Sequence, residues 1–164
     1  MNDEPQFNAK SVTILHGFFG DEFFEDLLKK PLGHMVVLEG RPTLAASKAL
    51  INALVKRKVK PFVIADNMAG FLFFQKYVKR VCVSYQSSSG ADIVAPIGSL
   101  VLAVLCDSHK VPMDAYPSNR EQQPLASPNS VYSFNGARVA PRGAKAYAPL
   151  LEEIPNKLIR KIYE

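Results

Sequence analysis

Short apolar runs alternate with longer amphipathic segments along the chain from Ser11 onward. The runs that predict strands span Ser11–Leu15, His34–Leu38, Pro61–Ala65, Arg80–Ser84 and Val111–Ala115. Each run is short and mostly apolar, which is typical of strands covered on both faces of a parallel sheet. Strands that alternate with helices form βα units with right-handed crossovers. We therefore expect one α/β domain over residues 1–164, with a Rossmann-like, mostly parallel sheet and helices on both faces.

The segments between the strands carry helical spacing and helix-end signals. The first, Asp21–Lys30, begins with acids and ends with lysines before a proline, which suits the helix dipole and stops the helix. Thr43 can cap a second helix over Leu44–Arg57. The remaining helices are expected from Asp66 or Asn67 to Tyr77 and over Ile97–Ser108.

The last part of the chain differs in composition. Pro117–Pro128 (117–128) is rich in Pro, Ser, Asn and Gln, which predicts a long surface loop or lid. Val131–Arg138 predicts a hairpin that turns at Asn135-Gly136. Glu152–Tyr163 predicts a closing helix with a proline in its first turn. Residues 1–10 precede the first strand and are expected to form an N-terminal tail.

Composition places the chain among ordinary globular domains. It has 164 residues, of which 48% are hydrophobic and 21% charged, enough for a single core. Cys82 and Cys106 lie inside apolar runs and no signal-peptide pattern precedes the domain, so we expect a reduced, cytoplasmic setting. No apolar stretch approaches the roughly 20 residues that a membrane-spanning helix needs, and we expect no membrane association.

Positive charge is unevenly distributed in a chain of net charge +5, with residues 31–90 holding a large excess of Lys and Arg over acids. Lys56, Arg57, Lys58 and Lys60 fall where the second predicted helix ends, a position at which cations complement the helix dipole and stay solvated. Nucleic-acid binding is the alternative interpretation. No ribonucleoprotein, zinc-finger or basic-zipper pattern supports it, so nucleic acid ranks last among the expected partners.

Ligands of open α/β sheets bind beyond the carboxyl ends of the strands. The polar residues that follow the predicted strands are therefore candidate ligand-binding residues, and they are Glu39, Arg41, Asp66, Asn67, Ser89, Gly90 and Ser99. His16, at the end of the first strand, is a candidate general acid or base. Asp92 is a second, weaker catalytic candidate.

Each candidate also has a structural interpretation. Glu39 and Arg41 lie two apart on an extended segment and can pair with each other, or Arg41 can grip a phosphate. Asp66 and Asn67 can simply cap a helix, and a lone histidine at a strand end is often a structural group. Ser87–Gly90 can form an anion-binding nest or a flexible connection.

Cofactor motifs are missing from the sequence. There is no Gly-x-Gly-x-x-Gly fingerprint and no Walker loop. The two cysteines and three histidines show no metal-ligand spacing. We expect neither a cofactor nor a bound metal.

Several motifs nevertheless follow one another in a recognisable order. They are His16, Glu39-Gly40-Arg41-Pro42, Ala65-Asp66-Asn67-Met68-Ala69, Ser89-Gly90, Ile97-Gly98-Ser99 and Tyr147–Pro155. Their order resembles the C-terminal domain shared by the alpha, beta and delta subunits of translation initiation factor 2B and by methylthioribose-1-phosphate isomerase. The resemblance covers the chain from about Ser11 to its end. It implies a fold of the NagB/RpiA/CoA-transferase type, a homodimer, and related subunits or a phosphorylated small molecule as partners.

The chain departs from that family at the catalytic positions. The position of the isomerase's reactive cysteine falls on Gly17, and that of its catalytic acid falls on Gln86. The family's phosphate-side Asn-Lys pair falls on Ala95-Pro96, and a further ligand glutamine falls on Ala45. A proton-transfer isomerase needs a group that titrates near working pH, which Gln86 lacks. The resemblance also implies a truncated member, because the isomerase carries an N-terminal helical domain before this one.

Three functional hypotheses follow. The first is a non-catalytic domain that binds a phosphorylated small molecule, such as a sugar phosphate or nucleotide, or a protein partner. The second is an aldose-phosphate isomerase that uses His16 or Asp92 in an altered role. The third is a homodimeric assembly module, because Phe71–Phe74 places apolar side chains almost all round its helix. Packing of these residues in the core is the alternative to that third hypothesis.

Overall fold

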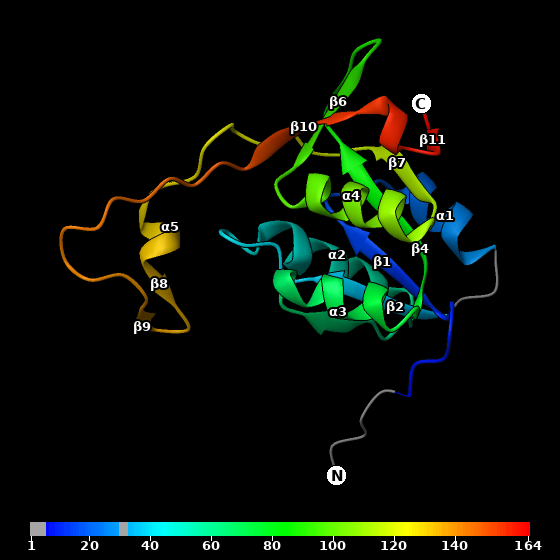
Figure 1. The fold of residues 1–164 in the computed structure, drawn as a ribbon, viewed down its shortest axis with the longest axis horizontal. Helices are drawn as coiled ribbons and strands as arrows, with labels where there is room; N and C mark the ends of the chain where they lie inside the picture. Colours follow the sequence, from blue (N-terminus) through cyan, green and yellow to red (C-terminus); the bar gives the residue numbers. More distant parts are fainter. Residues whose placement is uncertain (1–5, 30–32) are drawn as a thin grey trace.

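The centre of the molecule is a six-stranded parallel sheet in the order β11-β7-β4-β1-β2-β3 (Figure 1). The computed structural model describes residues 6–29 and 33–164. The strands of this sheet are β1 (Val12–His16), β2 (His34–Leu38), β3 (Phe62–Ile64), β4 (Val78–Tyr85), β7 (Met113–Pro117) and β11 (Lys161–Ile162). The predicted α/β class with a mostly parallel sheet is confirmed.

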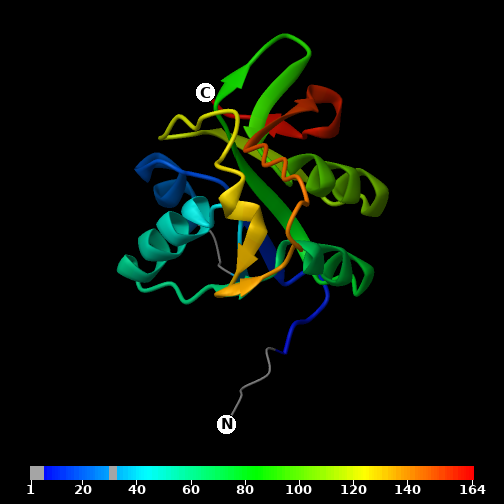
Figure 2. The same cartoon turned by 90° about the vertical axis from the view of Figure 1, so that its left-hand side faces the viewer.

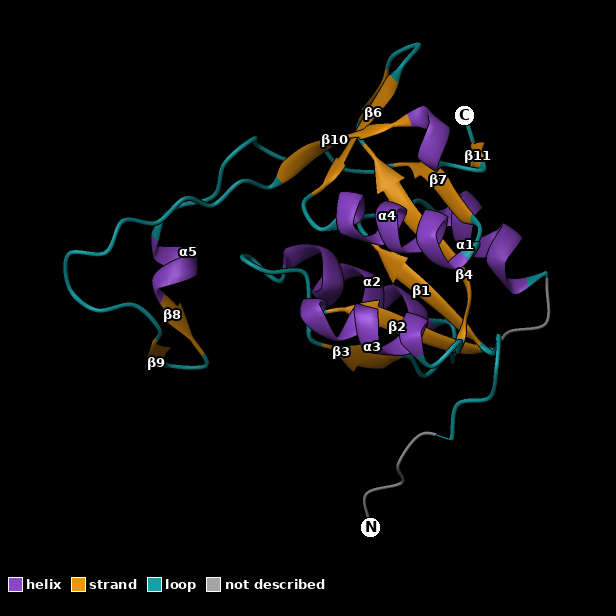
Figure 3. Cartoon of the chain, viewed as in Figure 1, coloured by secondary structure: helices purple, strands orange, loops and turns teal. Residues whose placement is uncertain are grey.

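Helices cover both faces of this sheet. They are α1 (Asp21–Leu28), α2 (Ala45–Lys56), α3 (Ala69–Phe74) and α4 (Ser99–His109), with a 3₁₀ turn η1 (Asp66–Met68) before α3. Helices α3 and α4 lie on one face and α1 and α2 on the other (Figure 3). The two-residue repeat of a strand explains this division, since Ile14 packs under α3 and α4 while Leu15 packs under α1 and α2. No helix in the described ranges is long and apolar enough to cross a membrane.

A smaller antiparallel sheet extends the domain beyond the parallel one. It has the order β10-β6-β5, with β10 (Leu151–Pro155), β6 (Asp92–Pro96) and β5 (Ser87–Ser88). A 3₁₀ turn, η2 (Asn156–Leu158), connects it to β11. The sequence did not predict this sheet, because Ser87 and Ser88 have little strand propensity and because β6 pairs with β10, a strand more than fifty residues later in the chain.

Residues 118–150 form an arm, and its outer part stands away from the two sheets on the left of Figure 1. Figure 2 shows the same arm end-on, in front of the sheets. The arm carries α5 (Asn129–Tyr132), β8 (Ser133–Phe134) and β9 (Ala137–Arg138). Its two limbs join at the root, where Ala126 N donates to Ala148 O at 2.8 Å and Leu150 N to Pro124 O at 2.9 Å. The predicted loop at 117–128 therefore corresponds only to the first part of this longer arm.

Several sequence predictions are confirmed at the level of elements. Strand β2 has the predicted bounds, and α1, α2 and α4 end within two residues of theirs, although Lys30 and the proline stop lie outside the described residues. The hairpin turns at Asn135-Gly136, both with positive φ. The third helix is shorter than predicted, ending at Phe74. Residues 6–10 carry Phe7, whose ring packs edge-on against Phe62 at 5.2 Å.

The predicted closing helix over Glu152–Tyr163 is wrong. Leu151–Pro155 is instead strand β10, paired antiparallel with β6 from Leu151 opposite Pro96 to Pro155 opposite Asp92. Strand β10 lies at the edge of its sheet, where a proline costs no hydrogen bond on the open side. The apolar side chain of Ile154 is fully buried in the core next to α4.

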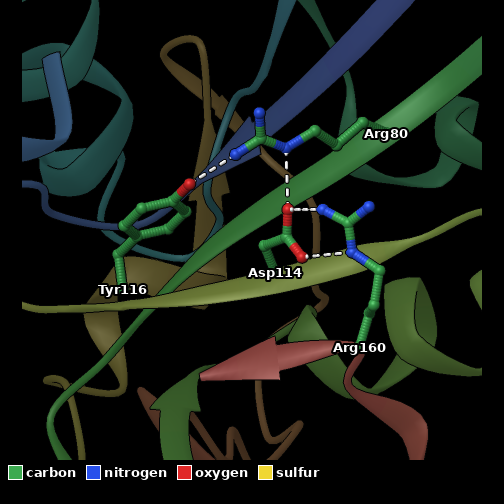
Figure 4. A network of polar contacts seen from close by, with 4 residues as sticks. All are labelled: Arg80, Asp114, Tyr116 and Arg160. Carbon is green, nitrogen blue, oxygen red and sulfur yellow. Dashed lines mark hydrogen bonds and ion pairs between the residues drawn. The ribbon is translucent and has the colours of Figure 1, made fainter. Parts of the chain in front are cut away.

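A buried carboxylate ties the last strand to the main sheet (Figure 4). Asp114 on β7 has no exposed surface. Its Oδ1 accepts a hydrogen bond from Arg160 Nε at 2.8 Å. Its Oδ2 lies 2.9 Å from Arg80 Nε, whose N–H is not directed at the oxygen, so this contact is an ion pair without a hydrogen bond. Arg80 also donates to the hydroxyl of Tyr116. The network joins β4, β7 and the segment before β11.

Replacing this carboxylate should be costly. We expect Asp114→Asn to lower the free energy of unfolding by about 3 kcal/mol, because it leaves the largely buried guanidinium group of Arg80 without its counter-charge. Urea denaturation followed by circular dichroism measures the change. Asp107→Asn is the matched control, because Asp107 pairs with Lys110 on the surface at 3.4 Å and should cost less than about 0.5 kcal/mol. Equal losses in the two variants would contradict a structural role for the network.

Candidate functional site

The carboxyl ends of β1, β2 and β3 meet the start of α4 at one edge of the parallel sheet. A small pocket of about 10 Å³ lies there, which is room for about one water molecule. Its lining residues are His16, Gly40, Arg41, Thr43, Ala46, Pro96, Ile97, Gln122 and Leu150. The structure thus brings the predicted candidates His16 and Arg41 together, and it adds Gln122 and Leu150 from the arm.

Asp66 fixes the loop that follows β2. Its Oδ1 accepts a hydrogen bond from Gly40 N at 2.9 Å and its Oδ2 accepts one from Arg41 N at 2.8 Å. The expectation that Asp66 caps the next helix is wrong, since its carboxylate reaches across to the neighbouring loop and η1 has no side-chain cap. Gly40 has a φ of 70°, a left-handed conformation that glycine adopts without strain.

Arg41 faces the arm. Its guanidinium carbon lies 4.8 Å from the centre of the Phe134 ring, a cation–π distance. Glu39 and Arg41 form no ion pair in the described part of the chain, so the structural pairing considered from the sequence is not made. Instead the Glu39 carbonyl accepts a hydrogen bond from Ser47 Oγ at 2.6 Å. The peptide bond between Arg41 and Pro42 is cis.

His16 is buried at the back of the pocket and hydrogen-bonded to the backbone. Its Nε2 lies 2.9 Å from the carbonyl oxygen of Ile97, and because a carbonyl can only accept, Nε2 carries the hydrogen. Burial lowers the pKa of His16 below its usual 6.5, although the hydrogen bond to Ile97 and the charges of Asp66 and Glu152 act in the opposite direction. The imidazole is therefore neutral near pH 7 and its Nε2 is already occupied.

The family resemblance expects a cysteine at position 17 and an acid at position 86, and both positions are in close contact with other parts of the chain. A β-carbon at Gly17, which has a φ of 122°, would overlap the hydroxyl of Ser84. That hydroxyl accepts a hydrogen bond from Phe18 N at 2.9 Å. Gln86 is bound on both sides of its amide by the arm, since Oε1 accepts from Gln122 N at 2.7 Å and Nε2 donates to Gln122 O at 3.3 Å.

The start of α4 holds an internal carboxylate. Leu100 N donates to Glu152 Oε1 at 2.8 Å, so a β10 side chain satisfies a backbone group that could otherwise bind an anion. Ser99 is fully buried, and its Oγ has no hydrogen-bond partner among the described residues. Sequence reasoning missed Glu152, because it placed that residue in a helix.

The other sequence candidates lie outside the pocket. Asn67 is exposed on η1. Ser89 and Gly90 form the exposed turn between β5 and β6, where Ser89 Oγ accepts from Asp92 N at 3.1 Å. The turn is held by hydrogen bonds of its own, because Ser89 N and Ser89 Oγ also donate to Asp92 O, at 2.8 and 3.1 Å. Within residues 6–29 and 33–164, no three His, Cys, Asp or Glu side chains cluster closely enough to hold a metal ion.

The acid sensitivity of folding should report on His16. Because its pKa is lower in the folded chain, the unfolded chain binds a proton first as pH falls below 6.5. Wild-type stability should therefore decrease below that pH relative to His16→Gln, with a slope that approaches about 1.4 kcal/mol per pH unit. Urea denaturation at several pH values from about 7 to about 5 measures how the free energy of unfolding changes with pH.

The exposed Asn67 on η1 provides the control, because its side chain has no titratable group. Asn67→Ala should leave the pH profile of stability parallel to that of the wild type. If His16→Gln also gives a parallel profile, His16 is not held neutral by burial.

Comparison with known proteins identifies relatives of this chain. The sequence model described as "Initiation factor 2 subunit family" matches residues 23–163. The methylthioribose-1-phosphate isomerase of Desulforamulus reducens is 28% identical over 141 residues, which are 79% of this chain and 41% of that protein. The enzyme of the same name from Thermus thermophilus is 31% identical over 141 residues, 79% of this chain and 43% of that protein. The chain thus spans less than half the length of these relatives.

Solved structures show the same fold. Translation initiation factor eIF-2B subunit delta from A. fulgidus superposes with a TM-score of 0.80 at 16% identity, covering 94% of this chain and 52% of that one. The 5-methylthioribose 1-phosphate isomerase of Pyrococcus horikoshii superposes with a TM-score of 0.76 at 22% identity, covering 94% and 49%. At these identities the superpositions describe the fold alone.

Proposed function

The chain belongs to the initiation factor 2 subunit family, and within that family we propose that it is a non-catalytic assembly domain that pairs with a second copy of itself. Two sets of observations support the proposal. One concerns the sheet edge, where His16 and Gln86 are hydrogen-bonded to the chain's own backbone. The other concerns the outer face of α3 and α4, which is apolar and exposed.

The pocket gives little support to catalysis. An aldose-ketose isomerase moves a proton, which requires a group able to take it up and release it near the substrate. Gln86 cannot titrate and is bound to Gln122. His16 donates its Nε2 hydrogen to Ile97, and the available space is about 10 Å³. The retained family residues act here as a frame that positions loops.

The exposed apolar face is the observation that carries the assembly proposal. Phe74 is 76% exposed, Phe71 56% and Val101 61%. Val104, on the outer side of α4, is also exposed, and α3 and α4 lie next to each other on the same side of the sheet (Figure 1). The alternative, that the apolar run at Phe71–Phe74 is all core, holds only for Leu72 and Phe73. Large apolar side chains gathered on one exposed face are typical of interaction surfaces.

A second copy fits this face for electrostatic reasons. Residues 67–75 contain no charged side chain, and neither do residues 97–106. An uncharged apolar face can pack against itself across a two-fold axis, whereas other parts of a chain with net charge +5 repel one another. Exposed apolar residues on the arm, Val139 and Tyr147 among them, add a further surface that a second copy can cover.

Light scattering coupled to size exclusion tests the pairing. We expect the wild type to have the mass of two chains, and Phe71→Ser with Phe74→Ser to weaken association at least about a hundredfold, because the variant removes two aromatic anchors. Val55→Ser is the control, because Val55 is similarly exposed (56%) but lies on α2, on the other face of the sheet. A monomeric wild type would contradict self-pairing, even if it associates with a related subunit. Self-pairing through this face would also be contradicted if the dimer of the Val55→Ser control dissociates as much as that of the double variant.

A second candidate function is binding of a phosphorylated small molecule at the same sheet edge. The observation that favours it is Ser99 Oγ, a buried hydroxyl without a partner at the first residue of α4. Ile97, two residues earlier, lines the pocket beside Arg41. Binding would require the arm to move, because Gln122 and Leu150 close that pocket.

Isothermal titration with ribose phosphates and nucleoside monophosphates tests this second candidate. If a phosphate binds, Arg41→Ala should weaken binding at least about tenfold through loss of a charge-assisted contact. Lys48→Ala, which removes an exposed charge from the outer side of α2, should leave it unchanged. No heat of binding to the wild type, or equal affinity in Arg41→Ala, would rule out this site. Ketose formation from the same aldose phosphates would overturn the non-catalytic assignment.

A further inference from the structure

The amino ends of the parallel strands form the edge of the sheet opposite the pocket, on the side away from the arm (Figure 1). The helices that connect the strands run back across the sheet, so they end at this edge too. The connections there carry exposed lysines, which we call the lysine edge. It consists of Lys10, Lys58, Lys60, Lys76, Lys79 and Lys110.

Four of these lysines have a backbone conformation that lysine rarely adopts. Lys10, Lys58, Lys76 and Lys110 have φ angles of 53°, 62°, 59° and 55°, in the left-handed region. They are four of the six non-glycine residues with positive φ in the described part of the chain. Glycine is the usual residue in this conformation after a helix, because any side chain there adds strain. Lysine therefore occupies a strained position after each of α2, α3 and α4.

The helix dipole does not explain this placement. A cation anywhere in the last turn complements the negative end of a helix, and Lys56 already does so in α2. A lysine in the left-handed position adds strain that this role does not require. The repeated choice of lysine points to a use for the positive charge outside the helix itself.

A bulge exposes one further lysine at the same edge. The residues on either side of Lys79, Val78 and Arg80, pair with consecutive residues of β1. Lys79 is thus an extra residue without a partner on β1, and its side chain is exposed. Bulges of this kind redirect a side chain at the margin of a sheet.

Most cations of the lysine edge have no counter-charge. Lys110 pairs with Asp107 at 3.4 Å, whereas the other five form no ion pair with a carboxylate among the described residues. The strand order sets the lysines in a row that runs from Lys110 before β7, past β4 and β1, to Lys60 before β3. Neighbouring strands are about 4.8 Å apart, so the row spans about 20 Å.

A row of lysines suits the phosphates of a nucleic-acid duplex. A duplex carries one phosphate charge per about 1.7 Å of its axis, so about ten lie along the row. Lysine contacts a phosphate as a point charge and reads no bases. A single strand would also need exposed rings on which its bases stack. At this edge Phe7 packs edge-on against Phe62 and Tyr77, with ring centres 5.2 and 5.8 Å away.

Other anionic partners fit the lysine edge less well. Protein interfaces are depleted in lysine and enriched in aromatic residues and arginine. Proteins that lie on anionic membranes carry their cations along an amphipathic helix, whereas these lysines come from separate connections between helices and strands. A duplex is therefore the partner that the arrangement favours.

We propose that the lysine edge binds the phosphate backbone of a double-stranded nucleic acid. The sequence ranked nucleic acid last because it showed only the run at Lys56–Lys60. The fold gathers lysines from three further connections beside that run. This surface goes beyond the proposed assembly function, and none of its residues lies within α3 or α4.

Fluorescence anisotropy with labelled duplexes of about twenty base pairs, one of RNA and one of DNA, tests the proposal. We expect saturable binding at low salt, and about five phosphate contacts give log K a slope of about −4.5 against log salt. Binding to either duplex supports the proposal, and the tighter one identifies the source of the phosphates. Absence of binding to both at about 50 mM salt would overturn it. Displacement of the duplex by phosphatidylserine vesicles at equal phosphate concentration would overturn it as well.

Glycine variants separate the charge of the lysine edge from its folding. Lys10→Gly, Lys58→Gly and Lys76→Gly combined remove three cations at positions where glycine adopts the backbone conformation without strain. The triple variant should bind the duplex at least about tenfold more weakly, with a salt slope smaller by about three. Its melting temperature shows that the fold is retained. Lys60→Gln with Lys79→Gln is a second variant, and its slope should be smaller by about two.

The matched control removes the same charge elsewhere. Lys48→Gln, Arg142→Gln and Lys145→Gln combined change exposed positions outside the lysine edge. They should alter the affinity less than about threefold, because salt screens distant charges. If this control weakens binding as much as the glycine variant, the effect is one of net charge and the proposal is wrong. Unchanged affinity in both lysine-edge variants would also overturn it.

Discussion

The carboxylate of Asp66 accepts two backbone hydrogen bonds from the neighbouring loop, and the arrangement of the sheet edge depends on them. Each is a charge-assisted bond of about 1.5–3 kcal/mol. By binding Gly40 and Arg41, the carboxylate sets where β2 ends and α2 begins, and it sends the Arg41 side chain toward the arm. Glu152 does the same for α4 by binding Leu100 N. The polar residues of this edge therefore hold loops in place around a pocket of about 10 Å³.

Much of the fold could be predicted from the sequence, because local pattern and tertiary contact agree there. Strand β2 has the predicted bounds His34–Leu38, and its residues Met35–Leu38 are apolar and buried inside the sheet. The error at Glu152–Tyr163 has a physical cause: Ile154, Leu158, Ile159 and Ile162 recur at helical spacing, but Leu151–Pro155 completes a sheet with β6, a strand more than fifty residues earlier in the chain. Such a non-local pairing leaves no trace in a local pattern.

The sequence predicted where the candidate site lies in the fold, but it did not predict most of the hydrogen bonds that its residues make. The strand-end rule located His16, Arg41 and Asp66 correctly at one sheet edge, because all parallel strands end on the same side. It could not tell that Asp66 binds a loop and leaves its own helix uncapped. Ser89, Gly90 and Asp92 follow the strand-end pattern too, but they belong to a hairpin outside the parallel sheet. A larger cavity beside β7 could not be predicted from the sequence, because its wall is formed by Phe23, Tyr116 and Tyr163, which are far apart in the chain.

Hydrogen bonds of the chain itself close the sheet-edge pocket, and amide hydrogen exchange measured by NMR tests this closure directly. The amides of Phe18, Gly40, Arg41 and Leu100 each donate to a side chain of the frame. They should exchange at least about a hundredfold more slowly than the amide of Gly90, which lies in an exposed turn. Exchange of these amides as fast as that of Gly90 would mean that the pocket is open, and would contradict the account.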